Sequence, residues 1–351
     1  MNKYGLILGI LFIACACSST EQVVLQTMEP SPVALPNAIK KIGIIDRSAP
    51  SEALTIENRV DQYLAAENRW LSEKGTNAAM TGLFDELLKD SRFDSVKLLD
   101  DVPAEMKEFS LEADSISWRS VEALCSAYEV DAIFSLAYYD TDTKVSLKKA
   151  SVLQTDLLRQ KVKVKGQEIT LETLIENGWR IYDPVNRRII DEIVFNDQII
   201  STGKGVDPLQ AYQSIGDRRE VILTKSRNTG SNYGLRLLPY ESSVSRRYYA
   251  RGTENFVKAS ELVVSGDWLG AGKLWEQEVQ NRDPKIQGRS CHNLAVLSER
   301  NEDLEKAAHW ANEALDYHYN KITSDYLDVL KKRAAQKDLL QQQLTQLQFS
   351  R

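Results

Sequence analysis

The chain has 351 residues, of which 42% are hydrophobic and 27% charged, and its formal net charge is −6. This length predicts about two domains, and the hydrophobic content is sufficient to bury a core in each. The acidic balance argues against nucleic-acid binding, which normally requires a basic face.

The chain begins with a segment typical of exported proteins. One lysine, Lys3, precedes an almost entirely apolar run over residues 4–16. This run is shorter than the roughly 20 residues that a membrane-spanning helix needs, and it resembles a secretory signal peptide. We therefore expect residues 1–17 to direct export.

Two cysteines close this run. The sequence Ala14-Cys15-Ala16-Cys17 resembles the lipobox of bacterial lipoproteins, in which a cysteine after small residues carries the lipid. Cys17 is the predicted lipidation site, because Ala16 precedes it and the polar residues 18–20 follow. Cys15 is an alternative site, and an ordinary cleaved signal whose cysteines have no role is the alternative interpretation.

Residues 18–37 contain three prolines and little periodic pattern, so we predict a tether between the anchor and the first domain. An α/β domain is predicted over 38–250. Its first part alternates β-branched runs with helical patterns, which indicates parallel strands joined by crossover helices. The predicted order is a strand at 39–48, a helix at 56–89, a strand at 93–100, a helix capped by Ser117, and a strand at 131–140.

The second part of this domain predicts antiparallel strands. Residues 179–182 and 188–195 are β-rich and flank the turn sequence Asp183-Pro184-Val185-Asn186, which favours a hairpin. Asp207 followed by Pro208 then predicts the start of a long helix within 206–239. The predicted sheet is therefore mixed, with a parallel core and an added antiparallel hairpin.

Residues 251–351 are predicted to be all-helical and to contain a repeat. Residues 266–279 and 301–315 share a frame of 36 residues, with small side chains at matched positions. The pattern resembles tetratricopeptide repeats followed by a capping helix, and a plain bundle of helix pairs is the alternative. The predicted packing residues are Ala271, Trp275, Leu294, Ala295, Ala307, Ala311 and Ala314.

Several stretches together resemble a family of uncharacterised Bacteroidota lipoproteins that join an α/β domain to tetratricopeptide-like repeats. They are "LPNAIKKIGIIDR", "GWRIYDP", "LLPYESSVSRRYYARGT" and "GDWLGAGKLW". The α/β half also resembles the N-terminal domains of TolB and of lipoproteins such as CsgG. Because the first family has no established activity, the resemblance implies only location and architecture.

Catalytic and metal-binding patterns are absent from the sequence. The three histidines are not spaced four apart, and HExxH, CxxC and GxSxG motifs do not occur. Residues 201–208 lack the spacing of a phosphate loop and are expected to form a joint before the helix capped by Asp207. The oxygens of Asp140 and Asp142 could bind a cation, but a loop at a strand end explains the two residues more simply. Cys125 and Cys291 are expected to be buried hydrophobic residues rather than a disulfide. We predict no catalytic residue, metal or cofactor.

One cluster has the composition of a binding surface. Aromatic and guanidinium groups gather in residues 243–253, and such groups are frequent in binding hot spots. The candidate residues are Arg246, Arg247, Tyr248, Tyr249 and Arg251. The alternative is a structural joint in which the tyrosines pack between two domains.

These observations predict a non-enzymatic lipoprotein of the outer membrane, anchored by lipid and binding a protein or peptide on its repeats. Glu21 is the only acidic residue just after the cysteine, which favours the periplasmic face over the cell surface. Two alternatives stay open: an envelope hydrolase with paired carboxylates, and a structural subunit of an outer-membrane assembly.

Overall fold

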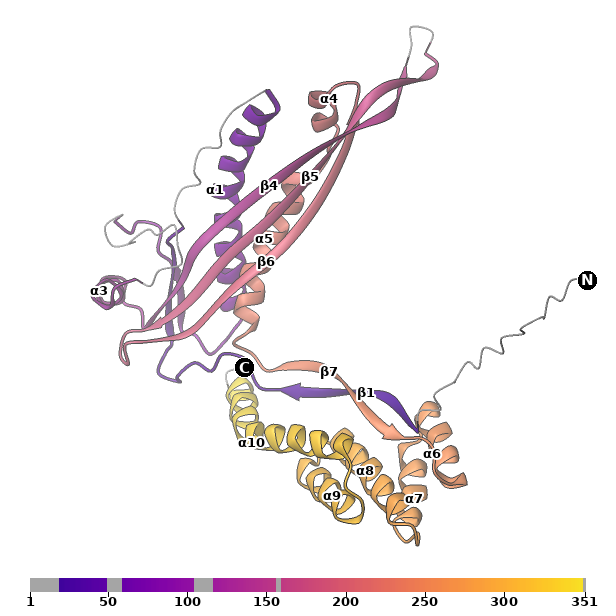
Figure 1. Ribbon diagram of the computed structural model, residues 1–351. Helices are drawn as coiled ribbons and strands as arrows, with labels where there is room; N and C mark the ends of the chain where they lie inside the picture. Colours follow the sequence, from indigo (N-terminus) through magenta and orange to yellow (C-terminus); the bar gives the residue numbers. More distant parts are fainter. Residues whose placement is uncertain (1–18, 49–58, 104–115, 156–158, 350–351) are drawn as a thin grey trace, which may run out of the picture. The chain divides into compact units, whose positions relative to one another are not determined.

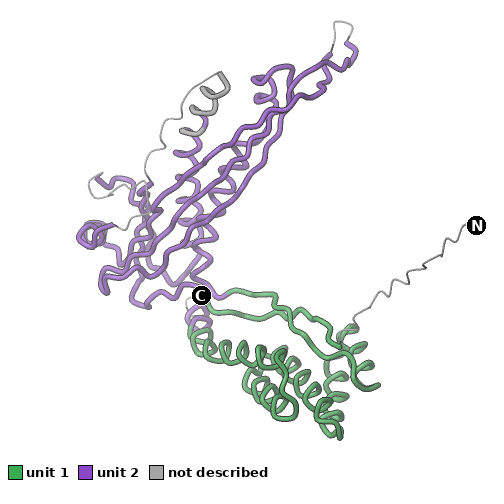
Figure 2. The backbone as a smooth tube through the Cα atoms, viewed as in Figure 1, with its two compact units in different colours: residues 1–30, 240–342 green, residues 31–239, 343–351 purple. Residues whose placement is uncertain are grey.

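The structure is a computed structural model that describes residues 19–48, 59–103, 116–155 and 159–349. Cys15 and Cys17 lie outside these residues. The chain forms two compact units (Figure 2). The helical unit comprises residues 1–30 and 240–342, and the sheet unit comprises residues 31–239 and 343–351. A mixed-sheet domain followed by an all-helical region confirms the predicted fold class.

The sheet unit is built on five strands in the order β3-β2-β4-β5-β6 (Figure 1). β2 lies parallel to β3 and to β4, whereas β4, β5 and β6 form an antiparallel meander. Their bounds are β2 Lys41–Asp46, β3 Ser95–Leu98, β4 Ala132–Thr155, β5 Lys161–Asp183 and β6 Arg188–Gly205. The helices are α1 Arg59–Leu88, α3 Trp118–Tyr128, α4 Pro208–Gln213 and α5 Arg218–Leu235.

Helices α1 and α5 pack together over one face of the sheet (Figure 1). They approach so closely that a Cβ atom on Gly230 would lie 1.9 Å from the carbonyl oxygen of Ala79. Gly230 therefore permits this crossing, since any side chain would collide with backbone. The core beneath contains Phe134, Trp179 and Tyr233, and the rings of Trp179 and Tyr233 stack with centroids 5.3 Å apart.

Helix α3 covers the opposite face of the sheet near the start of β4. Val121 and Leu124 pack there against Ile133 and Tyr182. The predicted cap is present, because the Ser117 hydroxyl accepts a hydrogen bond from the Ser120 amide. The predicted order of strand, helix, strand, helix, strand is therefore confirmed for this half of the unit.

The meander strands are much longer than predicted. The expected strand at 131–140 continues to Thr155, so Asp140 and Asp142 lie within β4 and not in a strand-end loop. The turn at 183–186 is present, with the Asp183 carboxylate accepting hydrogen bonds from the Val185 and Asn186 amides. The polar second half of β4 forms a strand because it pairs with β5. A short stretch of sequence does not contain this partner, so the sequence predicted an earlier end of the strand.

The predicted long helix within 206–239 is two helices. Asp207 caps α4 by accepting from the Gln210 amide, and Gly216 lies between α4 and α5. The glycine-rich residues 201–205 end β6 instead of forming a joint. A Cβ atom on Gly203 would lie 2.1 Å from the Ala211 carbonyl oxygen, so this glycine lets α4 pack onto the strand.

The helical unit contains α6 Glu254–Ser265, α7 Trp268–Glu278, α8 Pro284–Arg300, α9 Leu304–Tyr317 and α10 Lys321–Phe349, whose last residues belong to the sheet unit. Helices α7 and α9 begin 36 residues apart, at Trp268 and Leu304. Matched positions are buried in both helices: Ala271 with Ala307, and Trp275 with Ala311. The other predicted packing residues, Leu294, Ala295 and Ala314, are also buried.

A two-stranded antiparallel sheet completes the helical unit. It pairs β1 Thr20–Glu29 with β7 Tyr240–Tyr249, from Thr20 opposite Tyr249 to Glu29 opposite Tyr240. Half of the segment predicted as a tether, residues 20–29 of 18–37, is therefore a strand. The unit boundary falls at 239/240 and not at 250/251. The reason is packing, because Leu25 and Tyr248 are buried among the helices.

No helix in the described part of the chain is both long enough and apolar enough to span a membrane.

Candidate interaction groove

A hollow in the helical unit lies between β7 and the first turns of α10. It is a cavity of about 460 Å³, which we call the β7–α10 groove. It is lined by Ser245, Arg246, Arg247, His292, Lys321, Ile322, Asp325, Tyr326 and Val329. The residues from α10 recur at helical spacing, so one face of that helix forms one wall and β7 forms the other.

Arg246 fixes the β7 wall to α8. Its Nε donates to Oε2 of Glu299 over 2.7 Å, and its Nη2 donates to Oε1 over 2.8 Å. The guanidinium carbon also lies 5.7 Å from the ring centroid of Tyr326 on α10. A bidentate pair of this kind sets the orientation of both side chains as well as their distance.

Glu299 is a fully buried carboxylate that serves several donors. Besides Arg246, it accepts hydrogen bonds from the Tyr326 hydroxyl at 2.7 Å and from Nη1 of Arg333 at 2.6 Å. Burial alone raises the pKa of this carboxyl, but the hydrogen bonds and charges of its partners outweigh burial and hold the pKa below its ordinary value. Glu299 is therefore ionised and joins β7, α8 and α10.

Helix α8 also holds the backbone of β7. The side-chain amide of Asn293 accepts from the Tyr249 amide and donates to the Tyr249 carbonyl oxygen, both at 2.7 Å. His292 Nε2 donates to the Arg247 carbonyl oxygen at 2.9 Å, and Nδ1 lies 2.9 Å from the Thr323 hydroxyl. Because Asn293 and His292 are both buried, these bonds are shielded from water.

Burial lowers the pKa of His292 to about 4, against a smaller opposing effect of the Arg247 carbonyl. The imidazole is therefore neutral at physiological pH and contributes no charge to the groove. The charged groups that line the groove are Arg246, Arg247, Lys321 and Asp325, three cations and one anion. Because Arg246 is paired with the buried Glu299 and Lys321 with Asp325, Arg247 carries the positive charge of the lining that these pairs leave unbalanced.

The small sheet contacts the first helix of each helix pair and the final helix. The Tyr248 hydroxyl lies 2.9 Å from the Ser260 hydroxyl of α6, and Arg246 contacts Glu299 of α8. On the other strand, Glu29 pairs with Arg333 of α10 at 3.2 Å. The chain's own β1 and β7 therefore lie against helices of the region that the sequence predicted to bind a partner.

The structure separates the five residues predicted as a binding cluster. Arg246 and Arg247 line the groove. Tyr248 and Tyr249 are buried in the core of the helical unit, and they pack on its helices rather than between two domains. Arg251 is exposed and lies outside the lining.

Sequence reasoning missed Glu299, Asn293 and His292. Glu299 follows Ala295 by four residues, so it lies on the apolar face of its helix. A carboxylate on such a face needs a buried partner, so the position of Glu299 on the apolar face could have identified it from the sequence. The partner itself was not readable, because Arg246 lies 53 residues away in the chain.

A second hollow of about 370 Å³ lies in the sheet unit between α1, α4 and α5. Its buried carboxylate, Glu67, accepts from the Tyr212 hydroxyl at 2.7 Å, from Arg219 Nε at 2.9 Å and from Arg218. Donors from two other helices thus occupy this carboxylate, which marks it as a structural link between helices.

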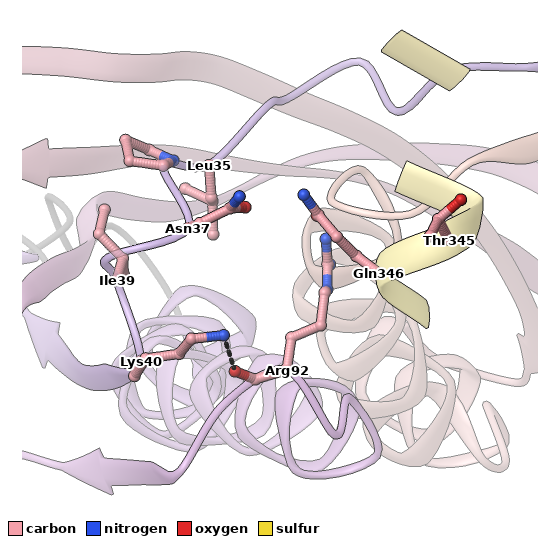
Figure 3. A pocket seen from close by; sticks show the side chains of 8 residues that line it. Leu35, Asn37, Ile39, Lys40, Arg92, Thr345 and Gln346 are labelled. Carbon is pink, nitrogen blue, oxygen red and sulfur yellow. Dashed lines mark hydrogen bonds between the residues drawn. The ribbon is translucent and has the colours of Figure 1, made fainter. Parts of the chain in front are cut away.

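Figure 3 shows a third hollow, of about 320 Å³, lined by residues 35–37, 39 and 40, by Arg92 and by the end of α10. Arg92 is held by Asp90, with Nη2 to Oδ2 at 2.6 Å, and by the Leu237 carbonyl oxygen at 2.9 Å. Lys40 Nζ donates to the Arg92 carbonyl oxygen at 3.1 Å. Both cations are engaged with their own chain, so this hollow offers little to a ligand.

Metal and thiol chemistry receive no support from the described residues. No group of three or more histidine, cysteine, aspartate or glutamate side chains gathers in them to hold a metal ion. Cys125 and Cys291 are free and buried, as expected. Burial, assisted by Asp131 for Cys125 and by Glu313 for Cys291, raises the pKa of each thiol to about 12.

Similar solved structures include the PelC dodecamer from Paraburkholderia phytofirmans, at 12% identity and a TM-score of 0.23. That match covers 60% of this chain and 96% of the other. A neuraminyllactose-binding hemagglutinin homolog from Helicobacter pylori matches at 13% identity and a TM-score of 0.22, covering 57% of this chain and 92% of the other. No curated protein matches the chain.

Two family models match the chain. Residues 257–332, within the helical unit, match the model described as domain of unknown function DUF6340. Residues 39–249 match the model described as domain of unknown function DUF8603, and this match spans more than half of the chain. The chain therefore belongs to the family of the domain of unknown function DUF8603.

Proposed function

We propose that this protein is an envelope lipoprotein, anchored through Cys17, whose helical unit binds a protein partner in the β7–α10 groove. The observation that carries the proposal is the groove itself. It is hollow and positively lined, and its α10 wall contains the apolar and aromatic side chains of Ile322, Tyr326 and Val329. Interaction sites commonly combine an apolar centre with charged groups at the rim.

We propose a place among the Bacteroidota lipoproteins that join an α/β domain to tetratricopeptide-like repeats, with the protein facing the periplasm at the outer membrane. The apolar leader, the lipobox-like cysteines and the 36-residue frame of α7 and α9 support it. At this groove a scaffold role fits better than hydrolysis by paired carboxylates, because Asp325 is the only carboxylate among its lining residues.

The proposed anchor lies close to the helical unit along the chain. Only residues 18 and 19 separate Cys17 from the start of β1 at Thr20. Three residue steps span at most ~10 Å. A lipid on Cys17 would therefore hold the start of β1, and with it the helical unit, near the bilayer surface.

The anchor is tested by replacing each cysteine separately. Cys17→Ala should move the protein from the membrane fraction to the soluble fraction, whereas Cys15→Ala should leave it in the membrane. Retention of the Cys17→Ala protein in washed membranes would reject the assignment. Mass spectrometry of the N-terminal peptide of the wild-type protein identifies the lipidated residue directly.

The partner is tested by photo-crosslinking in cells. A photoreactive amino acid at Val329, which lines the groove, should give a discrete adduct with a second protein after irradiation. The control position is Val264 on α6, which is 82% exposed but lies outside the groove lining. The proposal fails if Val329 gives no adduct, or if both positions give the same adducts.

A further inference from the structure

The outer edge of β7 has unpaired backbone groups. In an antiparallel pair, successive residues point their backbone groups alternately toward and away from the partner strand. The Tyr249 amide and carbonyl bond Asn293, whereas the Ala250 amide bonds the Ser19 carbonyl oxygen on the β1 side. The odd-numbered residues of β7 therefore point their backbone amide and carbonyl groups away from β1.

Within residues 243–247, this alternation identifies three free donors. The amides of Ser243, Ser245 and Arg247 point outward, and none of them donates a hydrogen bond to any described residue. Further along, the same edge is closed by the side chains of α8, since His292 binds the Arg247 carbonyl and Asn293 binds Tyr249. The open edge is thus a short stretch with a defined end.

The open edge borders the β7–α10 groove. Ser245, Arg246 and Arg247 form its β7 wall. Across the cavity, α10 presents Ile322 and Tyr326. A chain entering this space can bond the outward amides of β7 and place apolar side chains on α10 at the same time.

The charges indicate what the outward side chains of such a chain would be. Arg247 is exposed, and its guanidinium has no hydrogen bond or ion pair with any described residue. Lys321 lies on the opposite wall and is 83% exposed, paired only with Asp325 on its own helix. Alternate residues of a strand point to opposite faces, so one face of the entering chain would meet these cations.

We propose that the outer edge of β7 takes up an extended segment of a partner protein as a third strand, with apolar residues on one face and acidic residues on the other. The apolar residues contact Ile322, Tyr326 and Val329, and the acidic residues lie near Arg247 and Lys321. This inference rests on the proposed function and names the binding mode and the chemistry of its partner. Strand addition to an exposed edge is an established mode of peptide recognition.

The outer edge of β1, the other edge of the small sheet, serves as a control for the outer edge of β7. By the same alternation, Val24 points its amide away from β7, and its side chain is 62% exposed. No residue of β1 lines the groove. A proline at an outward position removes an outward donor while leaving the ladder between the strands intact. Ser245→Pro and Val24→Pro are therefore a matched pair.

The probe is a short, capped peptide of alternating valine and glutamate, added to the purified full chain. Binding is followed by fluorescence anisotropy of a dye on the peptide and by NMR of the backbone amides. We expect saturable binding and slower hydrogen exchange of the amides of Ser243, Ser245 and Arg247. The amides of Val244 and Arg246 already bond β1 and should change little.

Three comparisons decide the outcome. Ser245→Pro should weaken peptide binding by about tenfold, corresponding to one lost hydrogen bond, whereas Val24→Pro should not. A valine–lysine peptide should bind more weakly than the valine–glutamate peptide. N-methylation of the peptide backbone should abolish binding.

Three results would overturn strand addition: absence of peptide binding, equal effects of the two prolines, or a lysine or N-methylated peptide that binds as tightly as the valine–glutamate peptide. These results leave the photo-crosslink at Val329 unaffected. A crosslinked partner whose binding is insensitive to Ser245→Pro would therefore reject this inference while keeping the proposed function. Loss of the crosslink would reject the proposed function itself.

Discussion

Asn293 of α8 forms two hydrogen bonds to the backbone of a single residue, Tyr249 of β7, and each is 2.7 Å long. One side-chain amide therefore satisfies both an amide and a carbonyl group of a strand edge, much as a neighbouring strand would. Asn293 is fully buried, so water cannot replace it. This contact fastens the small sheet to the helices and closes one end of its outer edge.

Removing this amide should destabilise the helical unit. Asn293→Ala leaves two backbone groups of Tyr249 without their partner, and we expect a loss of about 2 kcal/mol in the free energy of unfolding. Asn293→Asp keeps an acceptor for the Tyr249 amide but loses the donor to its carbonyl. Urea denaturation measures both variants. Asn312→Ala on exposed α9 surface is the control and should be nearly neutral.

The buried carboxylate of Glu299 should be more important than any exposed ion pair. Glu299→Gln leaves Arg246 and Arg333 without their main anionic partner, and breaking a buried pair from one side typically costs about 3–5 kcal/mol. The control is Glu305→Gln, whose side chain is 87% exposed and lies 4.0 Å from Lys337. Equal stability of the two variants in a denaturation series would contradict the structure.

The neutral state of His292 predicts a pH-dependent stability. The pKa is about 4 in the folded protein and 6.5 in an exposed histidine, so the unfolded chain binds the extra proton between these values. Stability should therefore fall as the pH decreases from about 6.5 to about 4, and this residue should contribute no further loss below that. Two and a half pKa units correspond to about 3 kcal/mol.

The measurement is the free energy of unfolding at several pH values for the wild type and for His292→Gln. A glutamine cannot take up the proton, so the variant should lose the part of the pH dependence that lies between 6.5 and 4. Parallel pH profiles for the two proteins would show that His292 is not the titrating group.

The matched alanines should not tolerate larger side chains. Ala271 and Ala307 are both fully buried, so a leucine at either position adds volume where the helices already touch. We expect a cost of about 1–3 kcal/mol for Ala307→Leu, seen as a lower melting temperature of the helical unit. Ala335→Leu on the exposed side of α10 is the matched control. An unchanged melt for Ala307→Leu would place this residue at the surface.

The two thiols should be unreactive in the folded protein. Their raised pKa values of about 12 leave little thiolate at neutral pH, and both side chains are buried. In a chain that begins at Ser18, a thiol reagent should modify Cys125 and Cys291 only after denaturation. Rapid modification of either residue under native conditions would show that its helix opens.

Local patterns in the sequence determined much of the fold. The parallel strands of the sheet unit were readable because β-branched runs alternate with helical patterns, and the turn at 183–186 because aspartate, proline and asparagine each favour a turn conformation. Ser117 and Asp207 were recognisable as caps because capping needs only a side chain and the next backbone amides. The buried alanines of α7 and α9 were predictable because the sequence repeats after 36 residues.

Only the tertiary structure decided where the N-terminal strand belongs. Thr20 pairs with Tyr249, more than two hundred residues later, and no short window of sequence contains both partners. The ion pair between Arg246 and Glu299 was unpredictable for the same reason, since the two residues are far apart in the sequence. Arg246, predicted to lie in a binding cluster, is part of a buried network. Strand pairing and buried ion pairs depend on which distant groups packing brings together, and local propensity carries no information on that choice.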